Sequence, residues 1–410
     1  MTMGRFWLAA CALGMAATAP AKTWSNITTY PLQTAYSHPV GITTGSDGAL
    51  WFAEYDANKI GRITTGGAIT EYALPTAYSS PAGITAGPDG ALWFTEYSGN
   101  NLGRITTAGA VTEYPVPTAG SAPFGITVGP DGALWFSENL GNNIGRVTSA
   151  GVITAEYPVP TLDGDPSGIT TGPDGALWFT EEGGNKIGRI TTAGVVTAEY
   201  AVPTFSSAPY WIAAGPDGAL WFTEENGNKI GRITTAGAIA EYPVPAGSLP
   251  VGITAGPDGA LWFAEYGSNN IGRITTGGVI TQYSATGPDM ITVGPDGALW
   301  FTEVVFAGAD YNSIARAPAC GLGLSASFAN STLTLNFNLG IDTPATWFIN
   351  LRNRKQLRLE PIPAVVPPDS FTLTFGPGFP NLGEVTIVSG LETAPGEGLC
   401  YETVTVNTGE

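Results

Sequence analysis

The sequence predicts an all-β protein whose larger part is a seven-bladed β-propeller of four-stranded blades. Three observations support this prediction: a unit of 38 to 43 residues recurs seven times, each copy holds four short strand-like runs, and the run that the last copy lacks precedes the first copy. The 56 Gly and 32 Pro residues are typical of a protein with many turns. With 43% apolar residues and 11 Trp, the composition excludes a disordered chain.

The phrase Asp-Gly-Ala-Leu-Trp-Phe marks each copy of the unit, and its Trp residues are separated by 42, 42, 43, 43, 41 and 38 positions. Strand-like runs such as Gly-Ile-Thr and Ile-Gly-Arg-Ile-Thr alternate with clusters of Gly, Pro, Asp and Asn, which favour turns. The units lack helical periodicity, which excludes an α-solenoid. The seven Trp residues are Trp51, Trp93, Trp135, Trp178, Trp221, Trp262 and Trp300.

The seventh copy lacks a fourth strand, because it stops after the run 314–316. A matching run, residues 27–32, precedes the first copy and corresponds to residues 69–74 within it. We expect this N-terminal strand to complete the seventh blade, since closing the ring removes an exposed sheet edge.

Residues 1–21 have the layout of a secretory signal peptide: Arg5, an apolar run over 6–17, and small residues ending at Ala21. Cleavage is expected after Ala21, and lipidation at Cys11 is the alternative. The apolar run is too short for a transmembrane helix, and no later segment resembles one. We therefore expect a secreted or periplasmic protein that is not integral to a membrane.

Cleavage leaves a propeller over 22–317 and a C-terminal region over 318–410. The C-terminal region combines strand-like runs with many Pro and Gly residues, which predicts a small β-sandwich. Cys320 and Cys400 are the two cysteines that remain, and we expect them to form a disulfide in an oxidising compartment. The basic strip 351–358 is interpreted as a solvated strand face.

The charge balance narrows the possible partners. Acidic residues outnumber basic ones 34 to 16, so the net charge is −18. This balance excludes nucleic-acid binding through a basic face. The single histidine, His38, excludes zinc sites built from several histidines. We expect a monomer whose partner is a small molecule, a glycan or a peptide.

The repeat Gly-Pro-Asp-Gly-Ala-Leu-Trp-Phe-Thr-Glu, followed by Asn-Lys-Ile-Gly-Arg-Ile-Thr, resembles that of the streptogramin B lyase family (virginiamycin B lyase-like propellers) over residues 27–316. The resemblance implies a seven-bladed propeller that opens a cyclic depsipeptide antibiotic by elimination at its ester, without hydrolysis. Such chemistry needs a base for a Cα proton and a divalent ion, typically Mg²⁺, to polarise the ester carbonyl.

The residues that the resemblance assigns to this chemistry are changed at three of four positions. Asp289 stands where the family has its general-base His, Gly287 where it has a metal-binding Glu, and Val251 where a second His contacts substrate. Glu303 matches the other metal-binding Glu. By resemblance, Asp289 is the candidate catalytic base and Glu303 the candidate Mg²⁺ ligand, whereas His38 lies in the first unit and one residue out of register.

The Glu that follows Trp-Phe occurs in every copy, so we expect it to serve the blade rather than a ligand. The expected role is a turn or hydrogen bond beside the Gly-Arg strand, in a pair with the repeat Arg, while the Asp-Gly pairs are interpreted as hairpin turns. The glutamates are Glu54, Glu96, Glu138, Glu181, Glu224, Glu265 and Glu303. The arginines are Arg62, Arg104, Arg146, Arg189, Arg232, Arg273 and Arg316.

Functional residues are expected where the copies differ, at the start of the inner strand and directly after the repeat Glu. The aromatic and acidic residues found there are typical of a polar pocket for a sugar, a peptide or a cation. The first series is Val40, Ala82, Phe124, Ser167, Tyr210, Val251 and Asp289. The second series is Tyr55, Tyr97, Asn139, Glu182, Glu225, Tyr266 and Val304. The ligand-binding candidates are Phe124, Tyr210, Trp211, Val251 and Tyr266.

These observations predict a secreted or periplasmic binding or scaffold protein on a lyase-like propeller, with the family's catalytic centre not preserved. The alternative is an enzyme, either a metal-dependent carbon–oxygen lyase that opens streptogramin B-type rings or another hydrolase or lyase at the channel mouth. Asp289 suits abstraction of a Cα proton at neutral pH only where burial strongly raises its pKa.

Overall fold

The computed structural model describes residues 27–304 and 312–317 with their side chains and, between residues 325 and 407, the backbone of the strands. The predicted signal peptide over 1–21, the lipidation site Cys11 and Cys320 lie outside the described residues. The cleavage site and the disulfide from Cys320 to Cys400 therefore stay predictions. Within the described ranges, no helix combines the length and the hydropathy that crossing a bilayer requires.

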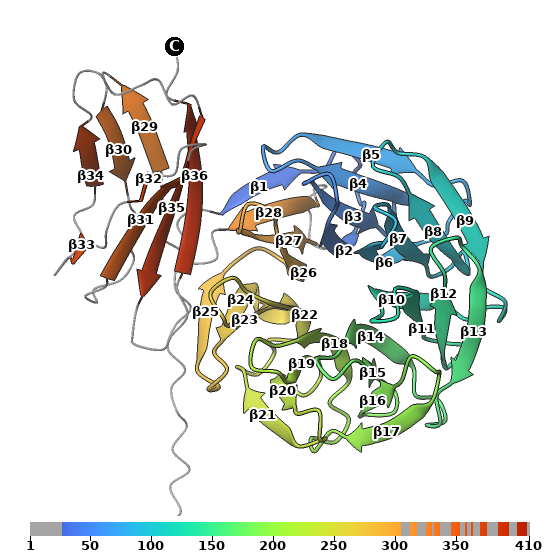
Figure 1. Ribbon diagram of the computed structural model, residues 1–410. Coiled ribbons are helices and arrows are strands. Elements are labelled where there is room, and N and C mark those ends of the chain that lie inside the picture. The colour runs from blue at the N-terminus through green and yellow to red at the C-terminus, as the bar shows by residue number, and fades with distance from the viewer. Residues whose placement is uncertain are drawn as a thin grey trace, which may run out of the picture.

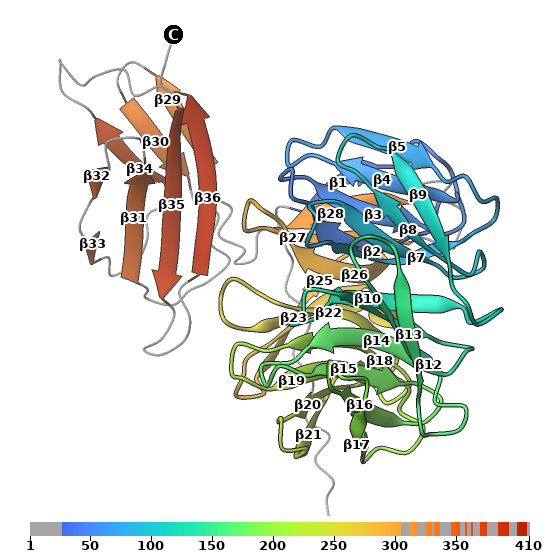
Figure 2. The ribbon, with the colours of Figure 1, turned by 45° about the vertical axis from the view of Figure 1, so that its right-hand side comes forward.

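The seven repeats form the predicted propeller, a ring of antiparallel four-stranded sheets around a central channel (Figures 1 and 2). Each blade runs from an inner strand beside the channel to an outer strand at the rim. The inner strands are β2 (Pro39–Thr44), β6 (Pro81–Ala86), β10 (Pro123–Val128), β14 (Pro166–Thr171), β18 (Pro209–Ala214), β22 (Pro250–Ala255) and β26 (Pro288–Val293). The second strands are β3 (Leu50–Glu54), β7 (Leu92–Glu96), β11 (Leu134–Glu138), β15 (Leu177–Glu181), β19 (Leu220–Glu224), β23 (Leu261–Glu265) and β27 (Leu299–Glu303).

The outer half of each blade contains two further strands, and a 3₁₀ turn, η1 (Tyr266–Ser268), follows β23. The third strands are β4 (Lys59–Ile63), β8 (Asn101–Ile105), β12 (Asn143–Val147), β16 (Lys186–Ile190), β20 (Lys229–Ile233), β24 (Asn270–Ile274) and β28 (Ser313–Ala317). The outer strands are β5 (Ile69–Ala73), β9 (Val111–Pro115), β13 (Ile153–Pro158), β17 (Val196–Ala201), β21 (Ile239–Pro243), β25 (Ile280–Ser284) and, for blade seven, β1 (Thr28–Pro31).

The N-terminal strand closes the ring. β1 pairs antiparallel with β28, with Tyr30 opposite Ile314, so blade seven has the order β26, β27, β28, β1. Tyr30 stacks on Trp300 with 5.7 Å between ring centroids, as the outer-strand Tyr of each other blade stacks on its own Trp. Gly67 of blade one faces this ring, and a Cβ there would lie 2.2 Å from Tyr30. The predicted closure is confirmed.

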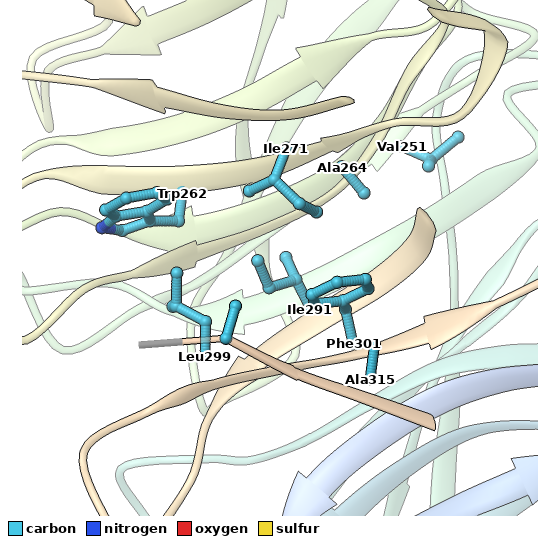
Figure 3. Packing of buried hydrophobic residues seen from close by; sticks show 9 residues of the cluster. Val251, Trp262, Ala264, Ile271, Ile291, Leu299, Phe301 and Ala315 are labelled. Atoms are coloured by element: carbon cyan, nitrogen blue, oxygen red, sulfur yellow. The ribbon is translucent and has the colours of Figure 1, made fainter. Parts of the chain in front are cut away.

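The apolar core lies between adjacent blades rather than in one central mass. Figure 3 shows one such interface, where Trp262 and Ile271 of blade six face Leu299 and Phe301 of blade seven. The repeat Trp residues are at most 1% exposed. Because burying one large apolar side chain stabilises a fold by about 1.5–3 kcal/mol, repetition of these contacts around the ring supplies the stability of the scaffold.

The turn Asp of each unit fixes the Trp and the Arg of its own blade. In blade one, Asp47 Oδ1 accepts a hydrogen bond from Trp51 Nε1 at 3.1 Å, and Oδ2 accepts one from Arg62 Nε at 2.7 Å. The predicted pairing of the repeat Glu with the repeat Arg is therefore wrong, because every repeat Arg in the described blades pairs with a turn Asp. The pairs are Asp47–Arg62, Asp89–Arg104, Asp131–Arg146, Asp174–Arg189, Asp217–Arg232, Asp258–Arg273 and Asp296–Arg316.

Strand register explains this correction. Glu54 lies opposite Lys59 at one end of the β3–β4 pair, whereas Arg62 lies opposite Trp51 near the other end. The Glu54 side chain is fully buried, and neither of its carboxyl oxygens has a hydrogen-bond partner among the described residues. Burial, together with the nearby charge of Glu71, raises the pKa of Glu54 to about 8. Burial also raises the pKa of the other repeat glutamates, to about 7 for Glu96, Glu138 and Glu181, to about 8 for Glu224, and above the ordinary value for Glu265 and Glu303.

Side-chain hydrogen bonds between blades hold the loops that lead into the inner strands. Asn58, in the left-handed region with φ 57°, accepts hydrogen bonds from the N–H and Oγ–H of Ser79 at 2.6 and 2.7 Å. Asn312 of blade seven, oriented so that its side-chain oxygen accepts, bonds the backbone N–H groups of Ser37 and His38 at 3.1 and 2.8 Å. An Asn side-chain oxygen that accepts backbone N–H groups therefore positions both an ordinary loop between blades and the loop at the ring closure.

The strands of the C-terminal region form two antiparallel sheets, in agreement with the predicted small β-sandwich (Figure 2). The first sheet contains β29 (Ser325–Ala329), β30 (Thr332–Asn336) and β34 (Ser370–Thr374). The second contains β31 (Thr346–Arg352), β32 (Leu357–Arg358), β33 (Ile362–Pro363), β35 (Glu384–Glu392) and β36 (Cys400–Asn407).

Candidate functional site

A cavity of about 600 Å³ lies at one mouth of the propeller channel. Its wall forms where the inner strands begin and the second strands end. These two ends meet because the strands are antiparallel, with Pro39 opposite Glu54 in blade one. Residues from all seven blades therefore converge on one space, whose volume suits a small-molecule ligand.

Both series of positions that vary among the blades lie in this wall, except for Val304. The inner strands contribute Val40, Ala82, Phe124, Ser167, Tyr210, Val251 and Asp289. The ends of the second strands contribute Tyr55, Tyr97, Asn139, Glu182, Glu225 and Tyr266. The five ligand-binding candidates and the candidate base are thus brought together, with Trp211 beside Tyr210.

Two bulky side chains, Trp211 and Met290, line the cavity. In five of the seven blades the third residue of the inner strand is Gly, because the neighbouring inner strand approaches closely. At Gly41, for example, a Cβ would lie 2.4 Å from the Ala82 carbonyl oxygen. Blades five and seven instead have Trp211 and Met290. Trp211 packs against the buried cluster that contains Met290 and Ile42, so side chains from three blades meet here.

Aromatic rings form an arc along the cavity wall. The ring centroids of Tyr55 and Tyr97 are 6.3 Å apart, and those of Tyr97 and Phe124 are 6.1 Å apart. Phe124 continues the arc to Tyr210 at 5.8 Å and to Trp211 at 6.2 Å. The contacts from Phe124 to Tyr97 and Trp211 are edge-on, a geometry that adds favourable electrostatic energy to the packing.

Three carboxyl groups line the cavity: Glu182, Glu225 and Asp289. Ser167 Oγ donates to Glu182 Oε2 at 3.1 Å, whereas no side-chain hydrogen bond to Glu225 or Asp289 is made by the described residues. Burial raises the pKa of all three groups. For Asp289 the burial and the charge of Glu225 raise the pKa to about 7. Asp289 therefore has the raised pKa that proton abstraction at neutral pH requires.

Tyr210 connects the carboxyl groups with the aromatic arc. Burial raises the pKa of its phenol well above the ordinary value, and the charges of Asp289, Glu182 and Glu225 act in the same direction. The phenol stays neutral and can donate a hydrogen bond to a ligand. Because its ring also contacts Phe124, Tyr210 presents both a polar and an aromatic group to the cavity.

His38 lies in the cavity wall, a position that was not predicted from the sequence. Its Nδ1 atom is 3.2 Å from Asp56 Oδ2, and its ring centroid is 5.7 Å from that of Tyr55. His38 was not counted among the site candidates because it lies in the first unit and one residue out of register. Its position directly before Pro39 was the available signal, because Pro39 begins the inner strand β2 at the channel mouth.

Glu303 lies apart from the cavity. Its side chain is buried within blade seven and accepts a hydrogen bond from Ser313 Oγ at 2.6 Å, and it does not belong to the cavity wall. In the described part of the chain, no three His, Cys, Asp or Glu side chains are grouped so that they hold a metal ion. The residues present therefore do not fit the Mg²⁺ site that the resemblance implies at Asp289 and Glu303.

The sequence of the propeller matches a known protein family over most of its length. The profile of the virginiamycin B lyase family matches residues 3–204 and 153–310. The chain belongs to the virginiamycin B lyase family. A virginiamycin B lyase from Staphylococcus aureus is 42% identical, with a TM-score of 0.66, and the match covers 71% of this chain and 98% of that lyase.

Two other solved lyases give the same result. A streptogramin B lyase is 39% identical, with a TM-score of 0.67 and coverage of 78% of this chain and 100% of that one. A catalytically inactive variant of the Staphylococcus aureus virginiamycin B lyase, with one His replaced by Ala, was solved with quinupristin; it is 42% identical over 71% of this chain and 98% of the variant, with a TM-score of 0.66. Each match thus covers nearly the whole length of the lyase chain.

Proposed function

We propose that this member of the virginiamycin B lyase family is an exported binding protein whose ligand occupies the mouth cavity. One observation carries the proposal: the blades repeat the same scaffold residues, while the positions that differ among blades gather in a single cavity. Residues required by every unit of a repeat protein serve its architecture, whereas an asymmetric ligand requires an asymmetric wall. The layout of residues 1–21 supports export.

The changes from the lyase pattern favour binding over the family's reaction. Val251 and Asp289 stand where the resemblance places histidines, and Gly287 stands where it places a metal-binding Glu. The solved variant of the Staphylococcus aureus enzyme is catalytically inactive after loss of a single His. In the present chain the one histidine, His38, is paired with Asp56 at the first blade.

The second candidate function is an elimination reaction that uses Asp289 as its base. The observation that favours it is the raised pKa of this carboxyl group, about 7. An ionised Asp289 oxygen would take the proton from the Cα of an ester-linked residue. The C–H electron pair would then form the Cα=Cβ double bond while the Cβ–O bond breaks and releases the carboxylate.

Quinupristin distinguishes the two functions. The purified protein is incubated with quinupristin and Mg²⁺, binding is measured by calorimetry, and ring opening is followed by mass spectrometry. We expect no linear product. Linear product that disappears in Asp289→Asn would replace the binding proposal with the lyase.

A ligand panel tests the binding function itself. Quinupristin, glycans, peptides and small amines are screened for an increase in thermal stability of the protein. We expect at least one ligand whose effect is lost in Tyr210→Ala and kept in Tyr78→Ala, since Tyr78 is exposed and lies outside the cavity wall. A ligand effect equally lost in both variants, or no ligand in the panel, would contradict a binding role for the cavity.

A further inference from the structure

No Lys or Arg side chain in the described cavity wall balances its carboxyl groups. Residues 27–304 and 312–317 contain three lysines and seven arginines, and each of them forms an ion pair with an acidic residue. None of these pairs involves Glu182, Glu225 or Asp289. The described wall of the cavity contains no Lys or Arg at all. The three carboxyl groups therefore make the cavity anionic when they are ionised.

The three carboxyl groups are near enough to influence one another. The charge of Glu225 acts on Asp289, and the charge of Glu182 acts on Glu225. Yet the described residues contain no trio of acidic side chains grouped closely enough to ligate one metal ion. This spacing suits a cation larger than a bare metal ion, whose charge lies within reach of several carboxylates at once.

Aromatic rings lie beside the same carboxyl groups. Tyr210 is within the electrostatic reach of all three, and Tyr266 is within that of Asp289. Phe124 and Trp211 border Tyr210 with ring centroids 5.8 and 6.4 Å away. An organic cation is attracted to ring faces within about 6 Å as well as to carboxylates, and desolvation in a cavity strengthens the attraction.

We propose that the cavity selects ligands that carry an organic ammonium group on an apolar or aromatic body. The inference rests on the proposed function, since it names the ligand class of that same cavity. The ammonium group lies among Glu182, Glu225 and Asp289, and the body packs on the arc formed by Tyr97, Phe124 and Trp211. A sugar would leave the unbalanced charge in place, and a carboxylate ligand would add to it.

A pair of nearly isosteric probes tests the charge requirement. Binding of 2-phenylethylammonium and of neutral 2-phenylethanol is measured by ligand-observed NMR titration at pH 7.5 and low salt. We expect the ammonium probe to bind at least about tenfold more tightly, a factor that one desolvated cation–aromatic contact or ion pair supplies. Glu225→Gln should weaken the ammonium probe severalfold and leave the alcohol unchanged. Asp163→Asn, which removes an exposed carboxylate outside the wall, should change neither.

Equal affinity for the two probes, tighter binding of the alcohol, or no binding of either at millimolar concentration would overturn the proposal. If the alcohol binds as well as the ammonium probe and Tyr210→Ala abolishes both, the cavity is a binding site for neutral ligands. The proposed function then stands while the ligand class is wrong.

The pH dependence gives an independent readout. Asp289 faces Glu225, Tyr210 and Tyr266, and the pKa of its carboxyl group is about 7. Glu225 faces Glu182, and Glu182 faces Ser167 and Asp165. The pKa values of the carboxyl groups of Glu225, Glu182 and Asp165 are also raised. The wall also contains His38, whose Nδ1 atom lies 3.2 Å from Asp56 Oδ2. Affinity for the ammonium probe should therefore increase from pH 5 to pH 8, and a flat profile would count against the three carboxylates as its partners.

Discussion

Replacing Glu54 by Gln should make the protein more stable than the wild type at pH 8 but not at pH 4.5. The Glu54 carboxyl group is fully buried and has a pKa of about 8 in the folded blade, against 4.5 as its ordinary value. A pKa that is higher in the folded state contributes stability that is complete below pH 4.5 and is lost as the pH rises through about 8. Since one pKa unit corresponds to about 1.4 kcal/mol, the loss approaches about 5 kcal/mol. Gln keeps the shape of the protonated group and does not ionise.

The prediction is checked by urea unfolding, followed through tryptophan fluorescence at pH 5, 6, 7 and 8. The difference in unfolding free energy between Glu54→Gln and the wild type should grow in favour of the variant by about 1.4 kcal/mol per pH unit. Asp47→Asn is the control: burial acts to raise the Asp47 pKa, but hydrogen bonds from Trp51 and Arg62 lower it overall, so this difference stays constant over the same range. A constant difference for Glu54→Gln would refute the assignment of a protonated buried carboxyl group.

Two further predictions concern the backbone at the ring closure and the C-terminal region. Gly67→Ala should destabilise the protein by more than Gly48→Ala, because both glycines have positive φ, at a cost of about 1–2 kcal/mol for a side chain, but only the Cβ at Gly67 meets the Tyr30 ring. Equal shifts in melting temperature would contradict this. Cys320 and Cys400 should react with a thiol reagent only after reduction, and labelling without a reductant would exclude the predicted disulfide.

The repeats made the fold and the position of the cavity predictable from sequence. Comparing seven copies separates scaffold positions from variable ones without any other sequence, and the strand order places the variable positions at one end of the channel. The missing strand of the seventh copy and its match over 27–32 predicted the closure, because an open edge would be costly. In a repeat protein, therefore, the internal alignment carries much of the structural information.

The internal alignment could not show which groups face each other across a strand pair. Glu54 and Arg62 lie eight positions apart in sequence and belong to adjacent strands, so a pair between them was reasonable, yet the register sets Glu54 opposite Lys59. The Asp47 carboxylate was interpreted as a turn residue alone, because nothing in the sequence indicates that its two oxygens serve different donors. Likewise, the depth at which Asp289 lies, and hence its raised pKa, depends on side chains from other blades.

Closure by β1 has a consequence for the order in which the propeller assembles. Within the propeller, residues 28–31 are made before any other strand, but their partner strand, 313–317, is made last. Blades one to six each form from contiguous sequence, whereas the seventh requires the most distant contact in the ring. Until that contact forms, β28 has one free edge, and β1 of a second chain fits it as well as the chain's own strand. At high concentration, the seam of blade seven is therefore where an exchanged dimer would arise.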